Sequence, residues 1–142
     1  MIINWYSKLH IVVRWNNCLF VPLRVRSGVR QGGMLSPSLF NVYADTLISN
    51  IVSSRSGCHV NQYCMACVMY ADDLLLLSAS VTGLQELINI CVSSSKDLCL
   101  TFNENKSYCI VVGPRTYDKL AEVCVDGNAL KWTNSTVLDI LV

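Results

Sequence analysis

The sequence predicts an α+β fold in which helices pack on one face of an antiparallel sheet. Two segments carry apolar residues at helical spacing, and the segments around them have the length and composition of strands. Two dipeptides typical of tight hairpin turns, Asn16-Asn17 and Asp126-Gly127, lie between strand-like segments. No internal repeat or linker is evident, so we expect residues 1–142 to form a single domain.

The first strand-like segment, residues 11–26, leads into a glycine-containing loop and then into a helix. Ser36 is a suitable N-cap for this helix, and Pro37 suits its first helical position. The apolar side of the helix is expected to comprise Phe40, Tyr43, Leu47, Ile48 and Ile51.

Residues 60–78 predict a second hairpin, whose strands join near Ala71–Asp73. Two adjacent carboxylates, Asp72 and Asp73, therefore fall in an otherwise apolar stretch. Two like charges ~4 Å apart repel by roughly 4 kcal/mol at an effective dielectric constant of 20, so a wet turn, a bound cation or both must offset the repulsion. A hairpin tip exposes the pair to water, while apolar residues such as Leu74–Leu77 anchor the strands.

A second helix is predicted over residues 81–96, with Thr82 and Gln85 as a capping box. Its apolar stripe comprises Leu84, Leu87, Ile88, Cys91 and Val92. Short strands are expected after it, over residues 98–102 and 107–113, followed by a hairpin that turns at Asp126-Gly127.

The composition does not predict a membrane-spanning helix, and the distribution of charge has two interpretations. The chain is 52% hydrophobic and only 15% charged, yet no apolar run reaches the ~18 residues that a membrane helix needs. Residues 1–44 hold five basic residues and no Asp or Glu, whereas the remainder carries six basic and ten acidic residues. This asymmetry fits a phosphate-rich partner, but ordinary surface arginines would give the same pattern.

Eight cysteines raise the question of zinc, because Cys64 and Cys67 form a CxxC with Cys58 and His59 just upstream. The CxxC runs into a strand-like segment, however, where residues three apart face opposite sides. Free cysteine is also common in protein cores, so zinc is the minority interpretation.

The carboxylate pair suits a hard cation better than it suits zinc. Mg²⁺ is usually held by one or two carboxylates together with substrate phosphates. Two such ions activate an attacking hydroxyl and stabilise the leaving group in nucleotidyl transfer. An acidic β-turn without any metal is the alternative for an isolated pair of aspartates.

Five motifs follow one another along the chain: Trp5-Tyr6 with Val13-Arg14-Trp15, then Gly28 to Tyr43, Tyr70 to Asp73, Asn103 to Lys106, and Val125 to Leu130. Together they resemble the reverse transcriptase palm of non-LTR, LINE-type retrotransposons, and this resemblance favours the catalytic interpretation. The resemblance implies a partial polymerase palm that uses Mg²⁺ or Mn²⁺ and acts on an RNA template, a DNA primer and deoxynucleoside triphosphates.

The resemblance also implies roles for individual residues. Asp72 and Asp73 match metal-binding carboxylates, and Lys106 matches a lysine proposed to assist pyrophosphate departure, although it would equally suit a solvated loop. The residues expected near nucleotide, template or primer are Gln31, Gly32, Gly33 and Tyr70, with Val125, Asp126 and Gly127 as primer grip. Phosphate contacts are assigned more weakly to Arg24, Arg26 and Arg30.

The same resemblance implies that the chain lacks part of the active site. The family's first catalytic aspartate precedes the segment that matches this chain, and Asp45 falls within a predicted helix. The fingers and most of the thumb are also expected to be missing, and Val137-Leu138-Asp139 departs from the family's last strand. We therefore expect the chain not to polymerise by itself and to lack parts of its own polyprotein.

Three hypotheses follow from the sequence: an incomplete polymerase palm, a nucleic-acid-binding remnant without catalysis, and a zinc-binding domain. No localisation signal is visible, and the family resemblance implies cytoplasm and nucleus.

Overall fold

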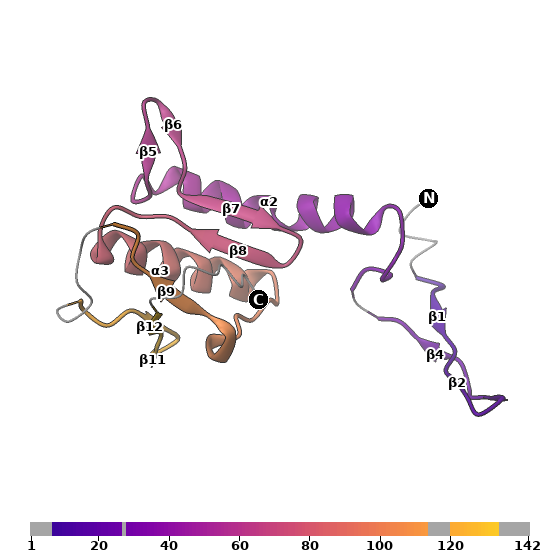
Figure 1. Ribbon diagram of the computed structural model, residues 1–142. Coiled ribbons are helices and arrows are strands. Elements are labelled where there is room, and N and C mark those ends of the chain that lie inside the picture. The colour runs from indigo at the N-terminus through magenta and orange to yellow at the C-terminus, as the bar shows by residue number, and fades with distance from the viewer. Residues whose placement is uncertain (1–6, 27, 114–119, 134–142) are drawn as a thin grey trace. The chain divides into compact units, whose positions relative to one another are not determined.

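The computed structural model describes residues 7–26, 28–113 and 120–133 (Figure 1). The chain divides into two compact units, Met1–Pro37 and Ser38–Val142, which are described separately. The sequence motifs at Trp5-Tyr6 and Val137-Leu138-Asp139 lie outside the described residues.

The first unit is built around a two-stranded antiparallel ribbon. Strand β1 (His10–Ile11) pairs with β4 (Leu23–Arg24), and β2 (Arg14–Trp15) pairs with β3 (Cys18–Leu19). The turn between β2 and β3 has positive φ at Asn16 (45°) and Asn17 (63°), as a type I′ hairpin turn requires. The hairpin predicted at Asn16-Asn17 is therefore confirmed.

Helix α2 (Ser36–Ser53) begins at the residue that we predicted as its N-cap. Its buried face consists of Ala44, Leu47 and Ile51, whereas Phe40 and Ile48 are half-buried. Tyr43, which was expected on the apolar side, is 45% exposed, and its hydroxyl donates a hydrogen bond to the carbonyl of Leu98.

Two hairpins follow α2. Strands β7 (Cys67–Tyr70) and β8 (Asp73–Leu76) form the hairpin predicted around the two aspartates. Strands β5 (His59–Val60) and β6 (Tyr63–Cys64) form a further hairpin that the sequence did not predict, and it projects beyond α2 in Figure 1. Its turn begins at Asn61, which has a positive φ of 56°.

Helix α3 (Val81–Asp97) is confirmed, but its capping differs from the prediction. The N-cap is Ser80, whose hydroxyl accepts a hydrogen bond from the backbone N–H of Gly83 at 3.0 Å, so Thr82 and Gln85 do not form a capping box. The predicted apolar stripe is largely correct: Leu87, Ile88 and Cys91 are buried, and Leu84 and Val92 are half-buried.

The end of α3 explains why the strand predicted over residues 98–102 is absent. The N–H of Cys99 donates to the carbonyl of Lys96, and the N–H of Leu100 donates to that of Ser95. With Cys99 at a φ of 50°, this is a Schellman motif, which closes a helix. The backbone groups that would have formed a strand ladder are used to end the helix.

The remaining described strands are short. Strands β10 (Cys124–Val125) and β11 (Asn128–Ala129) form the hairpin predicted at Asp126-Gly127, where both turn residues have positive φ. Strand β9 (Tyr108–Ile110) pairs with β12 (Lys131–Thr133) in parallel. The described strands thus form six two-stranded sheets, one of them parallel, rather than the single antiparallel sheet that we expected.

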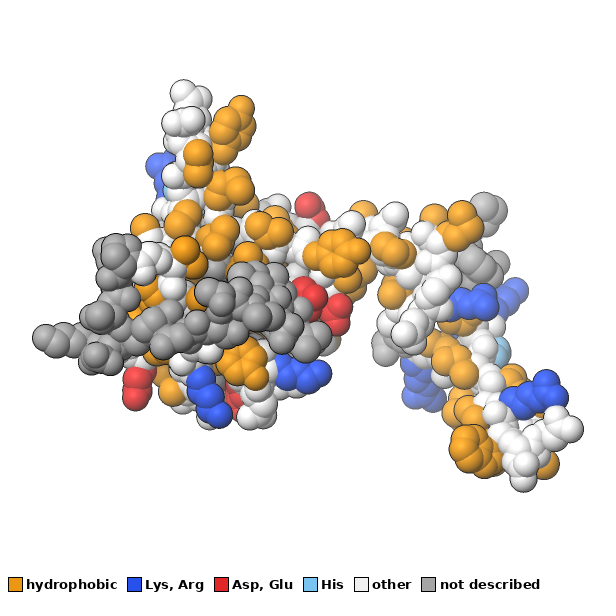
Figure 2. All heavy atoms as spheres, viewed as in Figure 1, with side chains coloured by type: hydrophobic (Ala, Val, Ile, Leu, Met, Phe, Trp, Pro, Cys, Tyr) orange, Lys and Arg blue, Asp and Glu red, His pale blue; other side chains and the backbone are white. Residues whose placement is uncertain are grey.

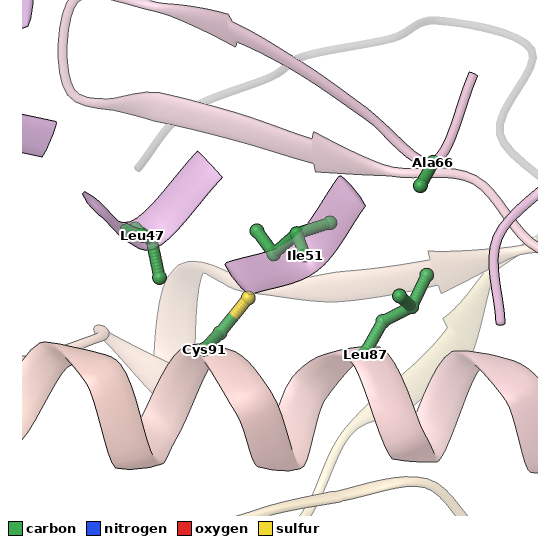
Figure 3. Close-up of a cluster of buried hydrophobic side chains, with 5 residues drawn as sticks. All are labelled: Leu47, Ile51, Ala66, Leu87 and Cys91. Carbon is green, nitrogen blue, oxygen red and sulfur yellow. The ribbon is translucent and has the colours of Figure 1, made fainter. Parts of the chain in front are cut away.

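Two hydrophobic clusters hold the second unit together. One joins α2 to α3 and contains Leu47, Ile51, Ala66, Leu87 and Cys91. In Figure 3, the four helix residues of this cluster lie between α2 and α3, and Ala66 comes from the segment before β7. The other contains Ile88, Cys109, Val123, Val125 and Leu130. The α+β class is therefore correct, with two helices and small strand pairs around these clusters. Among the described residues, no helix is long and apolar enough to cross a membrane.

Candidate nucleotidyl-transfer site

The β7–β8 hairpin places the two aspartates at successive positions of its tip. Tyr70 pairs with Asp73, so the two turn residues are Ala71 and Asp72. Ala71 has a φ of 53°, which is the positive value that primed hairpin turns require at their first central residue. Asp72 is exposed, whereas Asp73 is half-buried as the first residue of β8. The predicted tip is therefore correct, with the turn one residue earlier than the aspartate pair.

The strands behind the tip are half-buried and pack against the core through part of their side chains. Leu74 and Leu76 pack against the cluster that joins α2 and α3. The ladder continues past β8, because the N–H of Leu77 donates to the carbonyl of Ala66 at 2.8 Å. Carboxylates at the tip of such a hairpin keep a fixed position while remaining open to solvent.

The donors at this tip fit part of a magnesium site. Carboxylate oxygens are the ligands that Mg²⁺ prefers, and the ion commonly completes its octahedron with water and substrate phosphates. Within the described ranges, no group of three or more His, Cys, Asp or Glu side chains is arranged to hold a metal ion. Asp72 and Asp73 are thus two carboxylates of the kind that Mg²⁺ prefers, and no third candidate side chain is grouped with them among the described residues.

The cysteines around residue 60 gain no support as a zinc site. Zinc binds the thiolate form of cysteine. Burial, together with the neighbouring Cys64, raises the pKa of the Cys67 thiol, and a bound metal would have to lower it. Residues 58–67 all lie in the described part of the chain, and their His and Cys side chains form no group of three or more that could hold a metal ion.

The glycine loop before α2 has a backbone that larger residues would not adopt. Gly32 has a φ of 75°, in the left-handed region that glycine tolerates best. A Cβ on Gly33 would lie 2.7 Å from Oγ of Ser36 and 3.1 Å from the carbonyl oxygen of Arg30. The Ser36 hydroxyl donates to that same carbonyl at 2.5 Å, and Gln31 is exposed beside it.

Lys106 ends a short 3₁₀ helix, η1 (Glu104–Lys106), and is exposed. The side chain of Asn103 caps this element by accepting a hydrogen bond from the N–H of Asn105 at 3.2 Å. Glu104 accepts a hydrogen bond from Nδ2 of Asn128 at 2.6 Å, which joins η1 to β11. The structure therefore brings the Lys106 element and the Asp126-Gly127 hairpin together.

The residues predicted as primer grip divide between core and surface. Val125 is only 7% exposed and belongs to a hydrophobic cluster, so its side chain is a packing residue. Asp126 and Gly127 are exposed in the turn, and a carboxylate oxygen of Asp126 lies 3.5 Å from Nζ of Lys96. Only the turn itself is open to a partner.

The arginines assigned to phosphate contact, Arg24, Arg26 and Arg30, are exposed and belong to the first unit with the glycine loop. Nε and Nη2 of Arg24 donate to the carbonyl of Ser7 at 3.2 and 3.0 Å. The sequence assignments omitted Arg14, which is exposed in β2. His10 and Arg14 are four residues apart and so share one face of an extended strand, but only the pairing of His10 with Arg24 adds Arg24 to that face.

A family-wide sequence profile described as Reverse transcriptase (RNA-dependent DNA polymerase) matches residues 1–131. The chain is 35% identical over 99 residues to the Retrovirus-related Pol polyprotein from type-2 retrotransposable element R2DM of Drosophila melanogaster. It is also 36% identical over 73 residues and 28% identical over 101 residues to Pol polyproteins from the type-1 retrotransposable element R2 of Popillia japonica and Nasonia vitripennis.

These alignments cover most of the chain and a small part of each relative. They span 70%, 51% and 71% of this chain, but only 9%, 11% and 10% of the three polyproteins. The chain therefore corresponds to about a tenth of the length of the curated relatives that it matches.

Proposed function

The chain belongs to the reverse transcriptase (RNA-dependent DNA polymerase) family and is related to the Pol polyproteins of R2 non-LTR retrotransposons; on this premise, we propose that it is the part of a polymerase palm that carries two of the metal-binding carboxylates. The reaction would be nucleotidyl transfer, in which a primer hydroxyl attacks a deoxynucleoside triphosphate. An RNA template would direct the reaction.

One observation carries this proposal: Asp72 is exposed at the turn of a hairpin whose second strand packs against the core through Leu74 and Leu76. A metal ligand must be accessible to substrate phosphates and yet held in place, and this position meets both needs. Asp73 follows it on β8, half-buried, with less access to solvent. We assign the direct metal contact to Asp72 and a supporting contact to Asp73.

Bound Mg²⁺ or Mn²⁺ would activate the attacking hydroxyl and stabilise the leaving pyrophosphate. The chain's own residues would position the nucleic acid around the metal. Tyr70 is 82% exposed next to the turn and would contact the primer end. Lys106 would donate a proton or a hydrogen bond to the leaving group.

Two glycine-containing segments, the loop before α2 and the turn between β10 and β11, would contact nucleic acid through main-chain atoms. Gly32 and Gly33, beside Gln31, would let the loop backbone approach nucleotide and template, because glycine carries no Cβ. The Asp126-Gly127 turn would contact the primer strand, while Val125 anchors it in the core.

We further propose that this chain does not polymerise by itself. The two-metal mechanism needs carboxylates on both sides of the ion pair, and residues 1–44 contain no Asp or Glu. Asp45 is exposed on helix α2 rather than on a strand of the β7–β8 hairpin. The remaining ligand would come from another part of the polyprotein.

Primer extension on an RNA template with Mg²⁺ tests this proposal, with Asp72→Asn as the site variant and Asp45→Asn as a control of equal charge change. We expect no incorporation of labelled nucleotide by any of the three proteins. Incorporation by the unmodified chain and by Asp45→Asn, but not by Asp72→Asn, would show that the chain is complete and that Asp72 is catalytic. Equal incorporation by all three would contradict the assignment of Asp72.

A second candidate function is nucleic-acid binding without catalysis. It is favoured by the five basic residues and the absence of acidic ones in residues 1–44. Salt-dependent binding of RNA or DNA by a chain that also fails to bind Mn²⁺ at Asp72 would favour this function over the first.

A further inference from the structure

The ribbon of the first unit contains a β-bulge that the sequence did not predict. Ile11 pairs with Leu23, but the N–H of Phe20 donates to the carbonyl of Val13 at 3.0 Å. Two residues, Val21 and Pro22, therefore lie opposite Val12 alone. Pro22 has no N–H to donate, and a bulge is one of the few places in a ladder where proline is tolerated.

The register on both sides of the bulge gives the ribbon two chemically different faces. Residues directly opposite each other share a face, and neighbours along a strand alternate. His10 opposite Arg24, and Arg14 opposite Leu19, fall on one face. The other face carries only apolar side chains, namely Ile11, Val13, Trp15, Cys18, Phe20 and Leu23.

No carboxylate side chain of residues 1–44 can neutralise the face with Arg14 and Arg24, because this segment contains no Asp or Glu. Figure 2 shows blue Lys and Arg side chains spaced along this ribbon. Each guanidinium is oriented by a neutral oxygen of the ribbon: Nη2 of Arg14 donates to Oδ1 of Asn17 at 2.7 Å, and Arg24 donates to the carbonyl of Ser7. A guanidinium has five N–H donors, so each retains donors for a partner.

We propose that this basic face binds the phosphate backbone of a nucleic-acid duplex through Arg14 and Arg24. Arg24 pairs with His10, and His10 lies four residues before Arg14 on the neighbouring strand. At a strand rise of ~3.3 Å per residue, the two arginines are therefore about 13 Å apart along the ribbon. Neighbouring phosphates of one duplex strand lie closer together than this, so the two arginines can each contact a separate phosphate of the same strand. Contacts of this kind fix the position of the duplex without reading its sequence.

The inference rests on the proposed function, since it names how the same chain holds its nucleic acid, but it adds a surface distant in sequence from Asp72.

The test is fluorescence anisotropy of a short RNA–DNA hybrid duplex titrated with the full chain in EDTA over a series of salt concentrations. Arg14→Gln combined with Arg24→Gln is the site variant. Arg55→Gln combined with Lys131→Gln removes the same charge from exposed positions of the second unit and is its matched control.

Each phosphate contact contributes about 0.9 to the slope of log affinity against log salt, so the site variant is expected to reduce that slope by about 1.8. The control pair should leave the slope unchanged. Trp15→Ser, on the opposite face, should also leave it unchanged.

Equal slopes for the site variant and the control pair would overturn the inference, as would a chain that does not bind the duplex. Loss of affinity in Trp15→Ser without any effect of the arginine substitutions would also overturn the inference, because it would show that the apolar face contacts the duplex instead. EDTA removes free metal from this assay, so its outcomes do not depend on metal binding at Asp72. The role proposed for Asp72 is tested separately, by metal binding.

Discussion

The side-chain amide of Gln85 pairs with both backbone groups of Cys124. Nε2 of Gln85 donates to the carbonyl of Cys124 at 2.9 Å, and the N–H of Cys124 donates to Oε1 of Gln85 at 2.7 Å. A side chain of α3 thus takes the place of a neighbouring strand at the edge of β10. This pairing holds the Asp126-Gly127 hairpin against the helix.

Gln85→Ala is expected to destabilise the second unit by about 1–3 kcal/mol, because a half-buried N–H and a half-buried carbonyl lose their partners. The measurement is the urea midpoint at an unchanged m value. Gln62→Ala provides the control, since Gln62 is exposed in the β5–β6 turn and should change stability by less than about 0.5 kcal/mol. Equal effects of the two substitutions would contradict the bridging role of Gln85.

Ile51→Ala is expected to cost about 2–5 kcal/mol, since Ile51 is fully buried between α2 and α3 and a cavity would remain. Val52 is the next residue of the same helix and is 43% exposed. Val52→Ala should therefore cost much less, and it corrects for changes in helix propensity. Thermal unfolding of the three proteins checks the prediction, and similar midpoints for both variants would rule out the packing of α2 described above.

The buried thiols predict how stability depends on pH. Burial, with a smaller contribution from Cys67, raises the pKa of Cys91 to about 12, and burial raises that of Cys109 to about 11. Because the folded state favours the neutral thiol, this stabilisation is complete below the ordinary thiol pKa of 9.0 and is lost as pH rises from there towards 12.

Urea unfolding at neutral pH and at about pH 10 measures this loss of stability. Above pH 9, the Cys91 thiol alone lowers the free energy of unfolding by at most about 1.4 kcal/mol per pH unit. Cys91→Ala has no thiol to ionise at this position, so its stability should fall less steeply over the same interval. An identical pH dependence in both proteins would show that Cys91 is not buried in the folded state.

Elements whose signals are local could be predicted from the sequence. Asn16-Asn17 and Asp126-Gly127 combine turn residues that tolerate positive φ with flanking strand-like segments, and both hairpins are present. The periodic apolar residues of α2 and α3 placed most of their buried faces correctly. The aspartate hairpin was found for the same reason, since its anchoring leucines follow the turn directly.

Elements that depend on distant partners could not be predicted in this way. The parallel pairing of β9 with β12 joins segments more than twenty residues apart, and nothing within either segment specifies the direction. The Schellman motif at Cys99 replaced a predicted strand because a non-glycine residue adopts the left-handed conformation there. The β5–β6 hairpin was missed because the segment from Val60 to the aspartate turn was expected to be one strand, whereas the chain already turns at Asn61, whose φ is 56°.

The candidate site shows the same division. The apolar strand-like segments on either side placed Asp72 and Asp73 at a hairpin tip, which the backbone pairing bears out. Burial of Val125 and the hydrogen bond between Glu104 and Asn128 required the three-dimensional structure. The basic face with Arg14 and Arg24 depends on a bulge at Val21 and Pro22, which no single strand pattern reveals.

Binding of Mn²⁺ at the hairpin tip tests the central claim most directly. Paramagnetic Mn²⁺, added to the isotope-labelled chain at low concentration, should selectively broaden the backbone amide signals of Tyr70–Asp73. The broadening should persist in Asp45→Asn and disappear in Asp72→Asn. Absence of selective broadening at the tip, or its persistence in Asp72→Asn, would contradict the assignment of Asp72 as a metal ligand.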